Sequence, residues 1–253
     1  MHKYVTLTVL LLGFHCKYAW ADEYFSEQNY QALLEKECGQ LQQNAERGQQ
    51  YLQQAQYPQA LKQFQHQAAW TSICGVQAEL IGFIVSEQQQ INAEHDVGLS
   101  YIKLGKPLHA RAWFLIHPEY PPNHEALSAL VNTKTTQHLQ GTYLYYLGYG
   151  RWNRITVTRN KNHYDIAFEG FYFHAYTAAL GAPNMGEFYT RMPSTDTSTT
   201  YQDTHCRIDI AFKTDTLKGR LIDIEQKGYD SDCGFGANVN ATGQYIQVED
   251  END

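Results

Sequence analysis

The sequence predicts an α+β protein, in which a helical-repeat-like N-terminal bundle is followed by an antiparallel β-barrel or β-sandwich. Between residues 28 and 90 the apolar residues recur at helical spacing and glycine is scarce. From Gly141 onward, Tyr, Phe, Thr and Ile alternate with a period of two residues, as in half-buried strands. The change of pattern predicts a helical domain over residues 22–140 and a β domain over residues 141–253, which ends in an acidic tail.

The first 21 residues have the composition of a secretory signal peptide. A short basic start precedes an apolar run over residues 4–14, and Ala19-Trp20-Ala21 provides a small-residue cleavage site. An apolar run of this length is too short to cross a hydrocarbon core of about 30 Å as a helix. Cys16 suggests a lipoprotein as the alternative, but His15 stands where lipid attachment needs a small residue. We expect cleavage after Ala21, export to the periplasm, and no membrane-spanning segment in the mature chain.

Cysteine usage agrees with export. Four cysteines follow the leader, and an even number in an exported chain predicts two disulfides. Because two lie in each half, we expect Cys38 to pair with Cys74 and Cys206 with Cys233, rather than either of the other two pairings. A zinc site built from thiolates is disfavoured, since it needs short paired spacings such as Cys-x2-Cys.

The helical half is expected to begin with a helix whose buried stripe is Tyr30, Leu33, Leu34, Cys38 and Leu41. Further helices are expected over 44–54, 58–69 and 76–90. Pro58 fits the first turn of its helix, where the missing N–H costs nothing.

Two stretches of this half share one spacing. Gly48-x-x-Tyr51 is followed by Ala60-x-x-x-Phe64, and Gly98-x-x-Tyr101 is followed by Ala110-x-x-x-Phe114. The pattern resembles the tetratricopeptide repeat, in which small residues let two antiparallel helices touch, although the units lie about 50 residues apart instead of 34. The resemblance implies a protein-binding scaffold with no chemistry of its own.

The second half is expected to contain about eight short strands, separated by turns as in a small barrel or sandwich. The hairpin turn Asn160-Lys161-Asn162 separates two of them, and Gly234-Phe235-Gly236 indicates a tight backbone path with Phe235 turned inward. This half resembles small exported β-barrel domains of envelope proteins and secreted-enzyme inhibitors. The strands are expected over 142–147, 152–159, 164–169, 171–178, 186–192, 206–214, 220–227 and 244–249.

Candidate chemistry is sparse. The sequence lacks the motifs of serine hydrolases, zinc proteases, P-loop proteins and dinucleotide-binding folds, so we predict no catalytic residue, no cofactor and no metal site. The histidines at positions 109, 117 and 124 do not have ligand spacing. Asp223 and Glu225 share one face of a strand, as a glycosidase acid pair could, but this is also the ordinary solvent face of an amphipathic strand.

Aromatic density is the strongest functional signal. Aromatics fall on both faces of a strand in 143–146 and 171–173, so some must pack on the helical half or lie exposed. Exposed Tyr and Trp favour a binding surface, and packing between the halves is the alternative. The residues predicted to bind a partner are Tyr145, Tyr146, Tyr149, Trp152, Phe188 and Tyr189.

Charge narrows the class of partner. A net charge of −8 without a basic block disfavours nucleic acid and anionic lipid, and it favours a basic protein. We expect an exported, non-enzymatic protein-binding protein, such as an inhibitor or immunity protein against a toxin or envelope hydrolase, or an envelope assembly adaptor. The alternative is an enzyme or binding module that acts on a cell-wall glycan.

Overall fold

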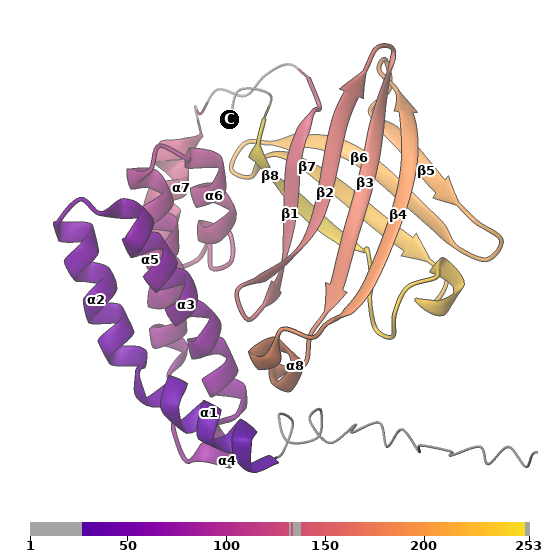
Figure 1. Cartoon of the computed structure of the whole chain (residues 1–253). Helices are drawn as coiled ribbons and strands as arrows, with labels where there is room; N and C mark the ends of the chain where they lie inside the picture. The colour runs from indigo at the N-terminus through magenta and orange to yellow at the C-terminus, as the bar shows by residue number, and fades with distance from the viewer. Residues whose placement is uncertain (1–26, 132, 134–137, 251–253) are drawn as a thin grey trace, which may run out of the picture.

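The computed structural model describes residues 27–131, 133 and 138–250, and it confirms the α+β class. Figure 1 shows the helical half lying beside a strongly curved sheet. The predicted leader, residues 1–21, and the last three residues of the acidic tail lie outside the described residues. The last helix of the first half ends at Leu130, and the first strand begins at Gly141.

Residues 27–131 form seven helices, and prolines stand in the first turn of three of them. The single helix expected over 76–90 is wrong. A short helix stops at Gly82, which has a left-handed backbone, and the next begins only after Ser86, whose hydroxyl accepts from the Gln89 N–H in a capping box. The helices are α1 (Glu27–Gly39), α2 (Leu41–Gln53), α3 (Tyr57–Val76), α4 (Ala78–Ile81), α5 (Glu87–Lys103), α6 (Pro107–Phe114) and α7 (Pro121–Leu130).

The contacts expected from the shared spacing are present in both helix pairs. A Cβ atom at Gly48 would lie 2.4 Å from the ring of Phe64, and one at Gly98 would lie 2.3 Å from the ring of Phe114. The two glycines therefore allow α2 to approach α3, and α5 to approach α6, at the same place. Membership of the tetratricopeptide family stays a prediction.

The turn between α2 and α3 offers a stabilising substitution. It holds Ala55 at φ 56°, where the equivalent turn between α5 and α6 holds Gly105 at φ 71°. A left-handed backbone costs an alanine about 1–2 kcal/mol, and a glycine adds about 0.5–1 kcal/mol of unfolded-state entropy. Ala55→Gly should therefore raise the free energy of unfolding, measured in urea, by about 0.5–1 kcal/mol. Ala45→Gly, inside α2, is the matched control and should lower it by about 1 kcal/mol; a decrease in both would contradict the prediction.

The second half is one antiparallel sheet of eight strands in the order β4-β3-β2-β1-β8-β7-β6-β5, curled into a nearly closed barrel. Phe188 on β4 stacks on Tyr201 on β5 with ring centroids 5.0 Å apart, so side chains link the two ends of the sheet. The strands are β1 (Gly141–Gly148), β2 (Arg151–Asn160), β3 (His163–Tyr172), β4 (Asn184–Pro193), β5 (Ser198–Gln202), β6 (Arg207–Asp215), β7 (Gly219–Lys227) and β8 (Gly243–Glu249).

Two parts of the sheet differ from the prediction. The expected strand over 171–178 is wrong, because β3 continues to Tyr172 and the chain then forms α8 (Ala175–Leu180). The His174 N–H donates to the Thr177 hydroxyl at 2.9 Å, which starts a helix in an alanine-rich segment. The sequence also does not predict β5, because its Ser/Thr-rich stretch has the composition of a loop.

Large side chains fill the barrel. Tyr143, Phe168 and Tyr245 are fully buried there, and Phe235 joins them, which confirms that it turns inward. The Tyr143 hydroxyl donates to the Leu139 carbonyl at 2.8 Å, so a polar tip is satisfied at the edge of the core. The barrel interior is therefore a packed core, and the binding surfaces must be sought on its outer face.

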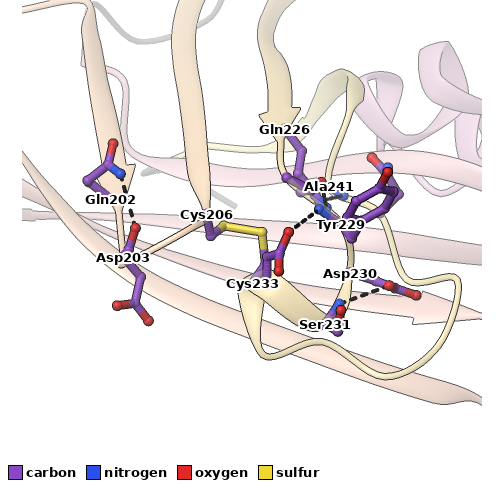
Figure 2. The surroundings of a disulfide bond; sticks show 12 residues. Gln202, Asp203, Cys206, Gln226, Tyr229, Asp230, Ser231, Cys233 and Ala241 are labelled. Atoms are coloured by element: carbon purple, nitrogen blue, oxygen red, sulfur yellow. Dashed lines mark hydrogen bonds between the residues drawn. A yellow bond between two sulfur atoms is a disulfide. The ribbon is translucent and has the colours of Figure 1, made fainter.

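Both predicted disulfides are confirmed. Cys38 on α1 is bonded to Cys74 on α3, and Cys206, before β6, is bonded to Cys233 in the loop after β7. Figure 2 shows the second bond anchoring this loop, in which the Tyr229 N–H donates to Asp232 at 2.9 Å. Within the described ranges, no helix has both the length and the apolar character that crossing a membrane requires.

Candidate functional site

The two halves meet along the outer face of the barrel near β1, β2 and β8. Ala112 on α6 packs with Leu221, Ile246 and Val248 of the sheet in a buried apolar cluster. The turn between β1 and β2 reaches the helices, since the Tyr149 N–H donates to the Ser72 hydroxyl at 3.4 Å. Three consecutive residues of this turn, 148–150, have positive φ, which lets the backbone approach α3 closely.

A buried carboxyl group links the halves. Glu94 on α5 is 1% exposed, and it accepts from the Tyr146 hydroxyl of β1 at 2.6 Å. Its other oxygen lies 2.8 Å from Nε2 of His117, which follows α6. The Tyr146 hydroxyl in turn accepts from the Gly150 N–H at 3.3 Å. These bonds join α5 and the segment after α6 to β1 and its turn, so the network holds the β1–β2 hairpin against the helices.

Burial, followed by the neighbouring Glu94 carboxylate, raises the pKa of Tyr146 well above its ordinary value. The phenol therefore keeps its proton and donates a hydrogen bond to Glu94. It serves as a fixed donor and is unsuited to act as a base near neutral pH.

Beside this network an open hollow of about 490 Å³ lies between α3 and α6 on one side and β1, β2 and β8 on the other. A second hollow of about 360 Å³ shares Leu144, Gly150, Arg151, Trp152 and Arg154 with it. We call the two together the junction groove. Its further lining is Gln65, His66, Ala69, Trp70, Tyr101, His109, Ala112, Trp113, Tyr149, Glu169, Phe171, Phe173, Gly181, Pro183 and Val248.

Aromatic contacts fix the walls of the groove. Trp152 packs edge-on against Trp113 across the junction, with ring centroids 5.3 Å apart, and it is 4.8 Å from Tyr146. On the helical side Tyr101 stacks on His109 at 4.8 Å. Since these rings constrain one another, a ligand would meet a surface with little side-chain entropy left to lose.

The charged groups of the groove are mostly cationic. Arg151 lies over the Phe173 ring, 5.5 Å from its centroid. Arg154 lies 3.4 Å from Glu169. The imidazole of His109 is 3.7 Å from a Glu249 carboxylate oxygen at the end of β8. An open groove with guanidinium groups and aromatic walls is suited to binding.

The six predicted partner-binding residues separate in the structure. Tyr149 and Trp152 line the groove, and Tyr146 lies against Trp152 with its hydroxyl on Glu94. The other three lie elsewhere on or in the barrel: Tyr145 packs on Tyr245, Phe188 is a core residue 2% exposed, and Tyr189 on β4 is 66% exposed. For the three aromatics at the junction, packing between the halves is therefore what the structure shows.

Sequence reasoning missed the helical side of the groove. Gln65, His109 and Trp113 come from two helices that no short motif connects, so only the fold brings them together. Arg151 had a usable signal, because it directly precedes an aromatic residue at a predicted strand start.

Another hollow, of about 800 Å³, lies on the outer face of β5–β8. Its acids are neutralised: Asp223 pairs with Lys213, and Asp209 lies 3.0 Å from Lys227. Hydrogen bonds, first from Arg207, hold the pKa of Asp209 well below its usual range, so it is no proton donor. The solvent face predicted for Asp223 and Glu225 is confirmed. Among the residues that the structure describes, no three His, Cys, Asp or Glu side chains are placed to hold a metal ion.

No protein-family model, curated protein or solved structure matches the chain. The geometry and chemistry of the junction groove therefore indicate the function. Aromatic residues line the groove on both sides, and its lining has more cationic than anionic side chains.

Proposed function

We propose that this is an exported, non-enzymatic binding protein that holds a segment of a partner protein in the junction groove. The observation that carries the proposal is the groove itself, where aromatic and cationic side chains from both halves converge on one open hollow of about 490 Å³. Such a hollow buries a short peptide segment between rigid walls, as specific recognition requires.

The two disulfides support export, because the reducing cytosol disfavours such bonds. Both disulfides join buried cysteines, and structural disulfides persist in oxidising compartments. The sequence of residues 1–21 adds the pattern of a signal peptide. A toxin, an envelope hydrolase or an envelope assembly component is the class of partner that fits a periplasmic location.

Photo-crosslinking in the exporting cell tests the proposal. Benzoylphenylalanine is placed at Trp152 or Gln65, on opposite walls of the groove, and at Tyr229, which is 79% exposed on a distant loop, as the control. We expect both groove positions to give one adduct of the same partner mass, identified by mass spectrometry, and Tyr229 to give none. Equal labelling from all three positions, or an adduct from Tyr229 alone, would overturn the assignment of the groove.

Binding of a cell-wall glycan is the second candidate. Trp152 and Tyr149 are partly exposed in the groove, and rings of this kind can stack on sugars. Titration of the protein with solubilised wall fragments, followed by tryptophan fluorescence, separates the candidates. Saturable binding or turnover that is lost in Trp152→Ala would favour the glycan.

A further inference from the structure

We infer that the segment held in the junction groove is acidic, and that Arg151 and Arg154 bind its carboxylates. This inference rests on the proposed function, which it deepens by naming the chemistry of the partner segment. It departs from the sequence expectation of a basic partner, which follows from the charge of the whole chain and stays untested.

The sign of the local charge differs from that of the whole chain. The chain carries a net charge of −8, yet the lining of the groove has two arginines, and Glu169 is the single carboxylate among its described lining residues. The two histidines of the lining each face a carboxylate just outside it, His66 facing Glu37 and His109 facing Glu249, so they add nothing to this excess. A local excess of guanidinium groups on an acidic protein attracts anionic groups to that place.

The state of Arg151 also favours an anionic ligand. Its side chain is exposed, and within residues 27–131, 133 and 138–250 no ion pair engages it. The Phe173 ring beneath it holds the guanidinium in place without using its hydrogen-bond donors. A guanidinium fixed on an aromatic face can offer two parallel N–H donors to one carboxylate.

The ion pair beside Arg151, between Arg154 and Glu169, is weak. Arg154 lies 3.4 Å from Glu169, and both side chains are about half exposed. Exposed pairs of this kind contribute little, because solvent screens them. A carboxylate of the partner can therefore replace Glu169 on Arg154 at small cost, and Glu169 occupies the site that the partner would fill.

The aromatic lining favours an acidic peptide over a sugar acid. A sugar acid needs a broad free ring face for stacking, but Trp113 is buried and Trp152 is packed edge-on against it. The helical wall instead carries the side-chain amide of Gln65, which donates to the Tyr101 hydroxyl at 3.0 Å. An amide beside packed aromatic side chains suits the side chains and backbone of a peptide.

Fluorescence anisotropy tests the inference, with the whole protein after removal of its predicted leader. The probes are a fluorescent peptide of alternating Glu and Leu, its counterpart with Lys in place of Glu, and a labelled oligogalacturonate. We expect the acidic peptide to bind the wild-type protein, and to bind the Arg151→Glu variant at least about tenfold more weakly. Glu169→Gln should bind it about threefold more tightly, because Arg154 is freed.

The matched control is Arg191→Glu, which makes the same charge change on β4 of the same barrel, outside the groove, where the side chain is 75% exposed. It should bind like the wild type, and thermal melts should show all variants folded. Preference for the Lys peptide, preference for the oligogalacturonate, or an Arg191→Glu effect as large as that of Arg151→Glu would each overturn the inference.

The two proposals fail separately. A crosslinked adduct at Trp152 or Gln65 whose peptide is basic or neutral overturns the acidic segment and leaves the groove as the binding site. Tight acidic-peptide binding with no groove adduct in cells overturns the proposed function and supports the anion preference of the groove.

Discussion

Replacing Glu94 by alanine should lower the free energy of unfolding by about 3 kcal/mol, measured by urea denaturation. The side chain is buried, and its loss removes the acceptor for both the Tyr146 hydroxyl and the His117 imidazole. Each buried donor left without a partner costs about 1–3 kcal/mol, and the vacated volume adds to that cost.

A double-mutant cycle shows whether the hydrogen bond to the buried carboxyl group is the cause. Tyr146→Phe should cost about 1.5–3 kcal/mol in the wild type, as expected for a hydrogen bond to a charged group, and about 1 kcal/mol in Glu94→Gln. Exposed Tyr189→Phe, on β4, is the control and should change stability by less than about 0.5 kcal/mol. Equal costs of Tyr146→Phe in both backgrounds would show that Glu94 does not act through this bond.

This network changes how the aromatic residues are tested. A Tyr146→Ala variant removes the link between the halves, so weaker binding in that variant would report loss of structure as well as loss of a contact. Trp152 packs on Trp113 across the junction, so its substitution carries the same ambiguity. Arg151 is exposed and lines the groove without a bond to Glu94, so its substitution reports on binding. The sequence alone does not make this distinction, because all of them lie in one aromatic stretch.

The fold could be predicted where local patterns carry it. Residues 155 and 157 share one face of their strand, as do residues 208 and 210, as expected from the alternation of apolar residues. The turn at Asn160-Lys161-Asn162 forms where the residues favour it, with Lys161 at φ 55°. The prediction failed over 171–178, where alternation of aromatics suggested a strand but alanines and a His174 cap gave a helix. It failed again at β5, whose threonines become a strand only because β6 offers a free edge.

Half of the groove could be predicted and half could not. Tyr149 and Trp152 stand out as aromatics near a predicted turn, whereas Trp70, Tyr101 and His109 belong to three different helices. Their convergence depends on the contact of α6 with β8, which is a tertiary contact between segments more than a hundred residues apart. No periodicity along the chain encodes such a contact.

Removing the bond between Cys206 and Cys233, by the paired change of both to alanine, should lower the free energy of unfolding by about 3–4 kcal/mol. The cysteines are 27 residues apart, and crosslinking them restricts the unfolded chain. Both side chains are buried, so alanine avoids placing a new hydroxyl in the core.

The location of the bond predicts where the loss is felt first. The bond fixes the segment after β7 (Figure 2). This segment carries Phe235 into the barrel core, next to Gly186 of β4. Hydrogen exchange should therefore speed up in residues 228–242 of the variant before it changes in α2 or α5. The paired change of Cys38 and Cys74 to alanine is the matched control, because it opens a loop of similar length between α1 and α3 and should speed exchange there instead. Uniform acceleration across both halves in either variant would show that the halves unfold as one unit, and would contradict the local effect argued here.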